Sequence, residues 1–170
     1  MKAANKPHFF AATIGALFAA GTLGVSTAQP PVDMPAFSVP FDAGVACSFP
    51  LAIEGSGTRL STKEYTDKNG LLNIFVSGAG YAFRYTNVAN GKSTTTPSQG
   101  ASQHVVVYPD GSQTITSNGA VLLIMFPTDI PAGPTTNYYN GHTALSLSAQ
   151  GVGILTAQHG KNIDICAKLS

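Results

Sequence analysis

The chain contains no tryptophan and few charged residues, and both absences narrow the functions it can support. Nine Lys/Arg and eight Asp/Glu residues are scattered singly over 170 positions, so no basic patch is present for nucleic acid or an anionic membrane. Without tryptophan to stack on a sugar ring, a glycosidase pair made by Glu54 and Glu64 has little support. We therefore expect no nucleic-acid partner and no glycosidase.

Motifs for metal binding and for common catalytic mechanisms are also missing. The histidines that follow residue 28, which are His104, His142 and His159, form no H-x-H or H-E-x-x-H spacing. The glycines at 55–57 and 78–80 lack the spacing and the following helix of a nucleophile elbow or a phosphate loop. We expect solvated histidines in turns, no metal and no cofactor.

The first 28 residues have the pattern of an export signal. Lys2 and Lys6 precede an apolar run at 9–25, and Ser26 and Ala28 place small residues at −3 and −1 of a cleavage point before Gln29. No later run is long and apolar enough to cross a membrane. The sequence predicts a secreted protein with no integral membrane segment once residues 1–28 are removed.

Two cysteines follow the signal, Cys47 near the start of the remaining chain and Cys166 near its end. In an oxidising compartment such a pair is read as a disulfide, and two separate thiols are the alternative. The closed loop of about 120 residues is worth about 4–5 kcal/mol in the chain-entropy model. We expect the bond to join the first strand to the last. Strand alternation places Cys166 away from the core, so either a bulge near Pro50 reverses the first strand or the bond lies outside the core.

The rest of the chain is typical of an all-β protein. Four prolines at 30–40 predict an extended lead-in over residues 29–42, and a single β domain follows over 43–170. Short apolar or alternating runs recur about every ten residues between turn residues, which predicts about ten strands in a meander-rich antiparallel β-sandwich or closed barrel. The expected strands are 45–53, 58–66, 71–77, 81–88, 93–96, 102–108, 113–117, 120–126, 143–149, 152–157 and 162–168.

Asn-Gly and Asp-Gly pairs supply most of the expected hairpin turns, because glycine tolerates positive φ there. We place turns at 67–70, 89–92, 109–111 and 118–119, with another Asn-Gly turn before His142 and a further turn at 158–162. Gly78 and Gly80 suggest a bulge or a tight corner. The run at 120–126 is apolar throughout and predicts a central strand that is buried on both faces.

The segment from 126 to 142 is the strongest candidate for binding. Three prolines stiffen its first part, and Asp129, Tyr138, Tyr139 and His142 could contact a ligand. If the tyrosines bind a partner, at least one ring should be exposed to solvent. The alternative is a loop that crosses between sheets, with one tyrosine packed in the core.

Several segments together resemble a group of small exported proteins from high-GC Gram-positive bacteria. The resemblance would cover nearly all of residues 43–170 and implies an exported β domain, without naming a catalytic residue. The segments that carry it are Cys47-Ser48-Phe49-Pro50, Tyr65-Thr66-Asp67-Lys68-Asn69-Gly70, Tyr108-Pro109-Asp110-Gly111-Ser112, the loop from Phe126 to Pro134, and Asp164-Ile165-Cys166.

Two functional hypotheses follow. The first is an exported, non-enzymatic binding or structural protein of the cell envelope or extracellular space, with an unidentified ligand and a cell-wall or protein partner. The second is a secreted hydrolase that uses some of His104, His142, Asp110 and Asp129. A hydrolase requires an imidazole about 3 Å from a carboxylate and a nucleophile.

The signal-peptide pattern makes a direct prediction about the exported protein. N-terminal sequencing of material recovered from the medium should begin at or near Gln29, because signal peptidase cleaves after small residues at −3 and −1. Recovery of the chain in membranes with Met1 retained would show instead that residues 1–28 act as an anchor.

Overall fold

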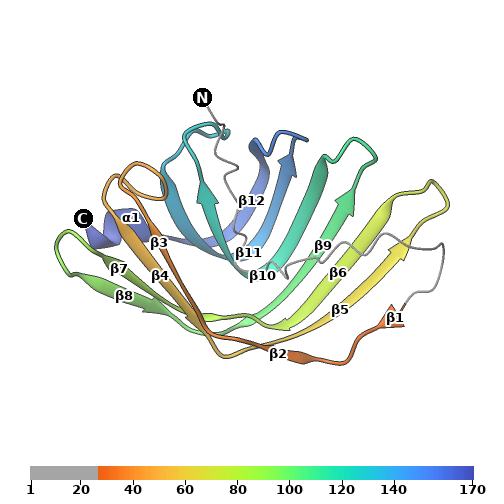
Figure 1. Ribbon diagram of the computed structural model, residues 1–170, viewed down its shortest axis with the longest axis horizontal. Helices are drawn as coiled ribbons and strands as arrows, with labels where there is room; N and C mark the ends of the chain where they lie inside the picture. The colour runs from red at the N-terminus through yellow and green to blue at the C-terminus, as the bar shows by residue number, and fades with distance from the viewer. Residues whose placement is uncertain (1–26) are drawn as a thin grey trace.

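The computed structural model describes residues 27–170 and contains two antiparallel sheets (Figure 1). The larger sheet has eight strands in the order β1-β5-β6-β9-β10-β11-β12, with β2 also paired to β5, and the smaller has the order β3-β4-β7-β8. The all-β prediction is confirmed, whereas the closed-barrel alternative is wrong because both sheets have free edges. The elements are β1 (Thr27–Ala28), β2 (Val32–Met34), β3 (Phe37–Phe41), β4 (Leu51–Ser56), β5 (Thr58–Thr66), β6 (Leu72–Ala79), β7 (Ala82–Asn87), β8 (Ser93–Thr96), β9 (Gly100–Val107), β10 (Gln113–Met125), β11 (Thr135–Leu147), β12 (Gly153–Asp164) and α1 (Ile165–Leu169).

The predicted signal lies outside the described residues except at its end. Thr27 and Ala28 form β1, which pairs with Lys63 and Glu64 of β5. Cleavage before Gln29 would remove this two-residue strand and leave the pairing of β2 with β5 in place.

The proline-rich lead-in is extended, as expected, but it also contributes strands to both sheets. Its first part, β2, pairs with β5 of the larger sheet, and its second part, β3, forms an edge of the smaller sheet beside β4. Pro40 lies within β3. An edge strand tolerates this residue because one side of the strand needs no donor.

Consecutive strands pass from one sheet to the other at tight corners. β4 leads into β5 through Gly57, β6 into β7 through Gly80 and Tyr81, and β8 into β9 through residues 97–99. The corner that Gly78 and Gly80 predict is therefore confirmed. The predicted turns at 67–70, 89–92 and 109–111 are also present, and each contains a glycine with positive φ.

Three predicted turns are wrong, because their glycines lie inside long strands. Gly119, Gly141 and Gly160 stand directly opposite one another in the middle of β10, β11 and β12. The row continues through Ala101 of β9 to Gly78 of β6. We call these five aligned positions the glycine row. Its four glycines have positive φ, which here bends a strand rather than reversing it.

Close approach of neighbouring backbones explains why the row needs glycine. A Cβ atom added to Gly119 would lie 2.3 Å from the carbonyl oxygen of Gly100, and one added to Gly141 would lie 2.2 Å from that of His159. No side chain can occupy such a position without moving the adjacent strand. The row therefore allows β10, β11 and β12 to fold over into a V, which Figure 1 shows with its closed end at the centre of the molecule.

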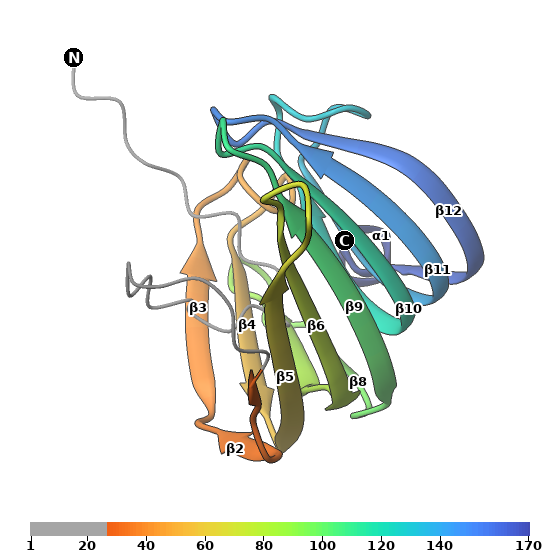
Figure 2. The ribbon, with the colours of Figure 1, turned by 90° about the vertical axis from the view of Figure 1, so that its right-hand side faces the viewer.

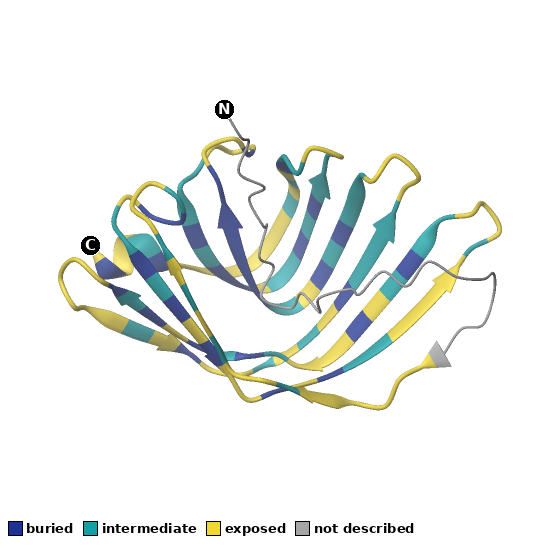
Figure 3. Ribbon diagram, in the orientation of Figure 1, coloured by how far each residue is buried: buried dark blue, intermediate teal, exposed yellow. Residues whose placement is uncertain are grey.

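The bend creates two hydrophobic cores on opposite faces of the same strand. Leu122, Ile124 and Phe126 of the β10 region pack toward the smaller sheet, in a core that also contains residues of β4, β7 and α1. The alternate residues Val121 and Leu123 pack inside the V with Ile115, Met125, Tyr139 and Leu145. The prediction that 120–126 is buried on both faces is confirmed. Figure 2 shows β9 to β12 side by side as a curved layer, and Figure 3 shows their buried positions.

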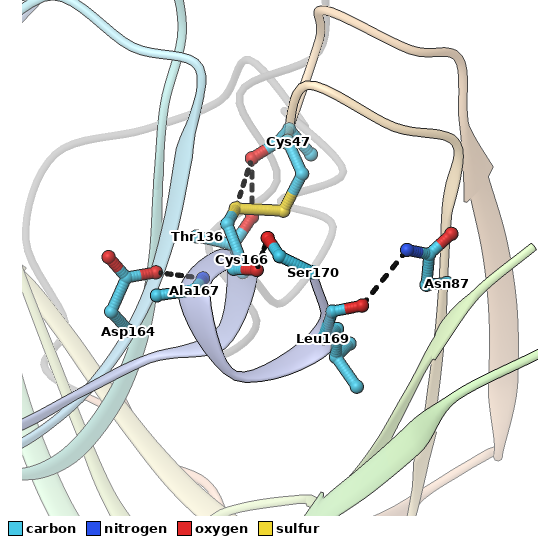
Figure 4. Close-up of a disulfide and its surroundings, with 9 residues drawn as sticks. Cys47, Asn87, Thr136, Asp164, Cys166, Ala167, Leu169 and Ser170 are labelled. Atoms are coloured by element: carbon cyan, nitrogen blue, oxygen red, sulfur yellow. Dashed lines mark hydrogen bonds between the residues drawn. A yellow bond between two sulfur atoms is a disulfide. The ribbon is translucent and has the colours of Figure 1, made fainter. Parts of the chain in front are cut away.

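The disulfide between Cys47 and Cys166 is present, with 5.5 Å between the Cα atoms (Figure 4). It does not join the first strand to the last, because Cys47 lies in the loop before β4 and Cys166 lies in α1. The expected strand at 162–168 is wrong in its second half. Asp164 ends β12 and caps α1 by accepting a hydrogen bond from Ala167 N at 2.9 Å.

Helix α1 packs in the core between the two sheets and is hydrogen-bonded to the smaller sheet. Ile165 and Leu169 are fully buried in this core. The carbonyl oxygen of Leu169 accepts hydrogen bonds from the side-chain amides of Asn87 at 3.0 Å and Asn90 at 3.1 Å. Neither expected explanation of the cysteine positions applies, because a helix rather than a strand presents Cys166 to the buried Cys47.

Two glycines with similar φ separate the cost of the backbone conformation from the cost of the close approach. Gly111, in the turn after β9, has φ +85° and open space around a built Cβ, whereas Gly119 has φ +92° and the Gly100 carbonyl at 2.3 Å. Gly111→Ala should lose about 1–2 kcal/mol, the usual cost of left-handed backbone. Gly119→Ala should lose at least about 2 kcal/mol more, because backbone must move. Denaturant unfolding measures both, and equal losses would show that the row tolerates a side chain.

Candidate functional site

The proline-rich loop at 126–134 bridges the open end of the V. Backbone hydrogen bonds of 2.8 Å run from Ile130 N to Gly153 O and from Leu155 N to Ile130 O, so the loop pairs with the start of β12. Ile130 lies in the loop that closes the β10–β11 hairpin, whereas Gly153 and Leu155 follow the other end of this hairpin. The bend at the glycine row brings them together.

The buried side chain of Asp129 holds this loop in place through hydrogen bonds. Its side chain is 4% exposed, and its two carboxylate oxygens accept hydrogen bonds from the backbone N–H groups of Phe126 at 2.6 Å and Gly153 at 2.8 Å. Because the group is buried and each oxygen binds a backbone N–H, this carboxylate is not presented to a ligand in solution. The loop joins β10 to β11, which pair within the larger sheet, so the expected alternative of a crossover between sheets is also wrong. The loop instead closes the bent hairpin against the start of β12.

The two tyrosines of the candidate segment are both core residues, each 4% exposed, so the expected exposed ring is not found. Tyr138 packs toward the smaller sheet and donates a hydrogen bond to the carbonyl oxygen of Pro97 at 3.1 Å. Tyr139 packs inside the V. Burial raises the pKa of both phenols above the ordinary value, and the charge of Asp164 adds to the rise at Tyr139.

His142 and His159 lie on strands rather than at the turns that the sequence predicts, whereas His104 lies on a strand as expected. His104 is on β9, where Nε2 is 2.9 Å from Oδ1 of Asn73 and the ring stacks on Phe75 with 4.0 Å between centroids. His142 on β11 hydrogen-bonds through Nδ1 to Oδ1 of Asn118 at 2.9 Å. The structure thus places His142 far from the proline-rich loop, on the bend of the sheet.

The residues proposed for a hydrolase are held by other partners. His104 and His142 bind amide oxygens, and both oxygens of Asp129 accept backbone hydrogen bonds. Asp110 lies exposed in the turn after β9, where hydrogen bonds from the hydroxyl and the backbone N–H of Ser112 lower the pKa of its carboxyl group. The four groups take part in separate local interactions and do not form an acid–base pair with one another.

A groove that the sequence analysis missed runs across the smaller sheet. Its volume is about 790 Å³, and segments of all four strands line it. Four exposed polar residues form one row in register across these strands, in the order Ser38, Glu54, Arg84 and Thr95. Glu54 and Arg84 are direct cross-strand neighbours at the centre of the row.

The aromatic side chains of these strands lie on the opposite face of the smaller sheet, against the core. Phe37 lies over Gly55, and a Cβ built on Gly55 would come within 2.5 Å of the Phe37 ring. Phe37 also makes an edge-to-face contact with the buried Tyr81, with 4.9 Å between ring centroids. The groove face therefore presents a hydroxyl, carboxylate and guanidinium row, and the Phe37 ring packs against the core behind it. Period-two alternation along residues 51–56 and 82–87 was the only sequence signal for this row.

Comparison with known proteins adds no family to these observations. The chain matches no family model, no curated protein and no solved structure. Within the stretch 27–170, no helix is long and apolar enough to cross a membrane. The same stretch contains no cluster of three or more His, Cys, Asp or Glu side chains that could hold a metal ion.

The burial of the tyrosines predicts a large stability effect. Tyr138→Ala and Tyr139→Ala should each reduce the free energy of unfolding by roughly 3–5 kcal/mol, as loss of a core aromatic ring does. Tyr108→Ala is the control, because this ring is 37% exposed and its loss should cost less than about 1 kcal/mol. Denaturant unfolding decides, and small losses at both core positions would restore these tyrosines as candidate ligand contacts.

Proposed function

We propose that this chain is an exported, non-enzymatic binding protein that holds a neutral, polar ligand in the groove of the smaller sheet. The observation that carries the proposal is the row of Ser38, Glu54, Arg84 and Thr95 along a groove of about 790 Å³. This volume is within the usual range for small-molecule sites. Its polar row suits a ligand with several hydrogen-bonding groups.

The charges of the groove argue for a neutral ligand. Glu54 and Arg84 stand opposite each other and balance, so neither sign of charge dominates the row. A carboxylate accepts hydrogen bonds from hydroxyl and amide groups, and a guanidinium donates them, often two at a time. Outside the cell, the glycan of the cell wall carries these hydroxyl and amide groups in abundance, and we propose it as the occupant.

Export is supported by three observations of different kinds. The N-terminal pattern is that of a signal peptide, the disulfide belongs to an oxidising compartment, and the described residues contain no membrane-spanning helix. The resemblance to small exported proteins of high-GC Gram-positive bacteria points the same way. A role in the cell envelope follows from export and from the proposed ligand together.

The probe for this proposal is the trisaccharide of N-acetylglucosamine. Added at millimolar concentration to the isotope-labelled protein, it should shift the backbone amide NMR signals of Gly55, Arg84 and Thr95. Glu54→Gln and Arg84→Ala should each weaken binding at least tenfold, since a hydrogen bond to a charged group contributes about 1.5–3 kcal/mol. The trisaccharide should be recovered intact, because the groove row contains no activated nucleophile.

Lys63→Ala on β5 is the matched control, since it removes an exposed charge outside the groove. It should bind the trisaccharide as the parent protein does. Absence of any shift in the groove would refute the cell-wall ligand, and cleavage of the trisaccharide would favour the hydrolase hypothesis instead.

A further inference from the structure

Two histidines that are 17 positions apart in the sequence stand side by side on the sheet. His142 of β11 and His159 of β12 are directly opposite in register, with 6.3 Å between ring centroids and 27° between ring planes. His159 is exposed and His142 is half-buried, so solvent reaches the pair. Neither residue contributes to the groove or to either hydrophobic core.

A hydrogen bond determines which nitrogen of His142 is free. Nδ1 is 2.9 Å from Oδ1 of Asn118, the residue directly opposite on β10. An amide oxygen can only accept, so Nδ1 carries the proton and donates it. In the neutral ring, Nε2 then has an unprotonated lone pair. This is the arrangement in which a second residue orients a histidine that binds a metal.

We propose that His142 and His159 form a surface site for a divalent transition-metal cation of the Cu²⁺, Ni²⁺ and Zn²⁺ class. A cation about 2.0–2.1 Å from each imidazole nitrogen can join rings whose centroids are up to about 6.4 Å apart. That limit applies when both lone pairs point at the cation along the line between the centroids. The observed rings are stacked, with 6.3 Å between centroids and 27° between planes, so the side chains must rotate to bring both lone pairs to one cation. A tetrahedral arrangement needs the rings about 1 Å closer, which rotation of the exposed His159 side chain can supply.

The backbone around the pair is held in place by the bend of the sheet. Gly141 and Gly160, each adjacent to one of the histidines, are paired in the glycine row, where neighbouring backbones are too close for a side chain. The two strands therefore present the imidazoles from fixed positions. Two protein ligands leave the remaining coordination positions to water, and neutral imidazoles favour borderline cations over Mg²⁺ or Ca²⁺.

The test uses CuCl₂ alone as the probe, because Cu²⁺ binds most tightly within this class. Titration of the purified, disulfide-bonded protein should broaden the NMR signals of His142 and His159 first and saturate at one ion per chain. His142→Ala and His159→Ala should each weaken binding at least tenfold. Asn118→Ala should weaken it about tenfold, as loss of an orienting hydrogen bond does.

His104→Ala is the matched control, because His104 lies on the same sheet but its Nε2 bonds to Asn73 and its ring stacks on Phe75. This variant should bind Cu²⁺ as the parent protein does. Equal binding by the parent protein and both single-histidine variants would overturn the site, as would broadening centred on His104. His159 is exposed, so its variant should keep the parent amide spectrum and remains informative if His142→Ala does not fold.

Discussion

The close approach of backbones along the glycine row is the constraint on which the rest of this structure depends. At Gly119, Gly141 and Gly160 the neighbouring carbonyl oxygen is 2.2–2.5 Å from the position that a Cβ would take. Only a residue without a side chain allows three long strands to bend at the same level. Without this bend, β10 and β11 would form a straight hairpin with its loop far from the start of β12.

The bend also explains why residues 120–126 are apolar on both faces of the strand. It turns the second half of β10 into a layer between two cores, so that successive side chains face opposite apolar surroundings. The loop after β10 reaches the start of β12, and Asp129 holds it there through two backbone N–H groups. The prolines of this loop suggested a ligand-binding segment, but its contacts hold the bent hairpin against β12.

The disulfide also holds separate segments of the chain together, at the core between the two sheets. It fastens α1, which follows the last strand, to the loop that precedes β4. The helix fills the space between the sheets with Ile165 and Leu169, and the carbonyl oxygen of Leu169 is bound by two asparagines of the β7–β8 hairpin region. These contacts join α1 to the smaller sheet, whose polar row lies on the face away from the core.

The sequence by itself determined the all-β class, the turns at 67–70, 89–92 and 109–111, the cysteine pairing and the double-sided burial of 120–126, because these follow from local alternation and composition. It also marked Gly119 and Gly141 as positions of positive φ. Whether such a glycine reverses the chain or bends a strand depends on neighbouring strands, which no local pattern encodes. Only the tertiary structure decided that Tyr138 and Tyr139 are core residues. Only register across separate strands brought Glu54 to Arg84 and His142 to His159.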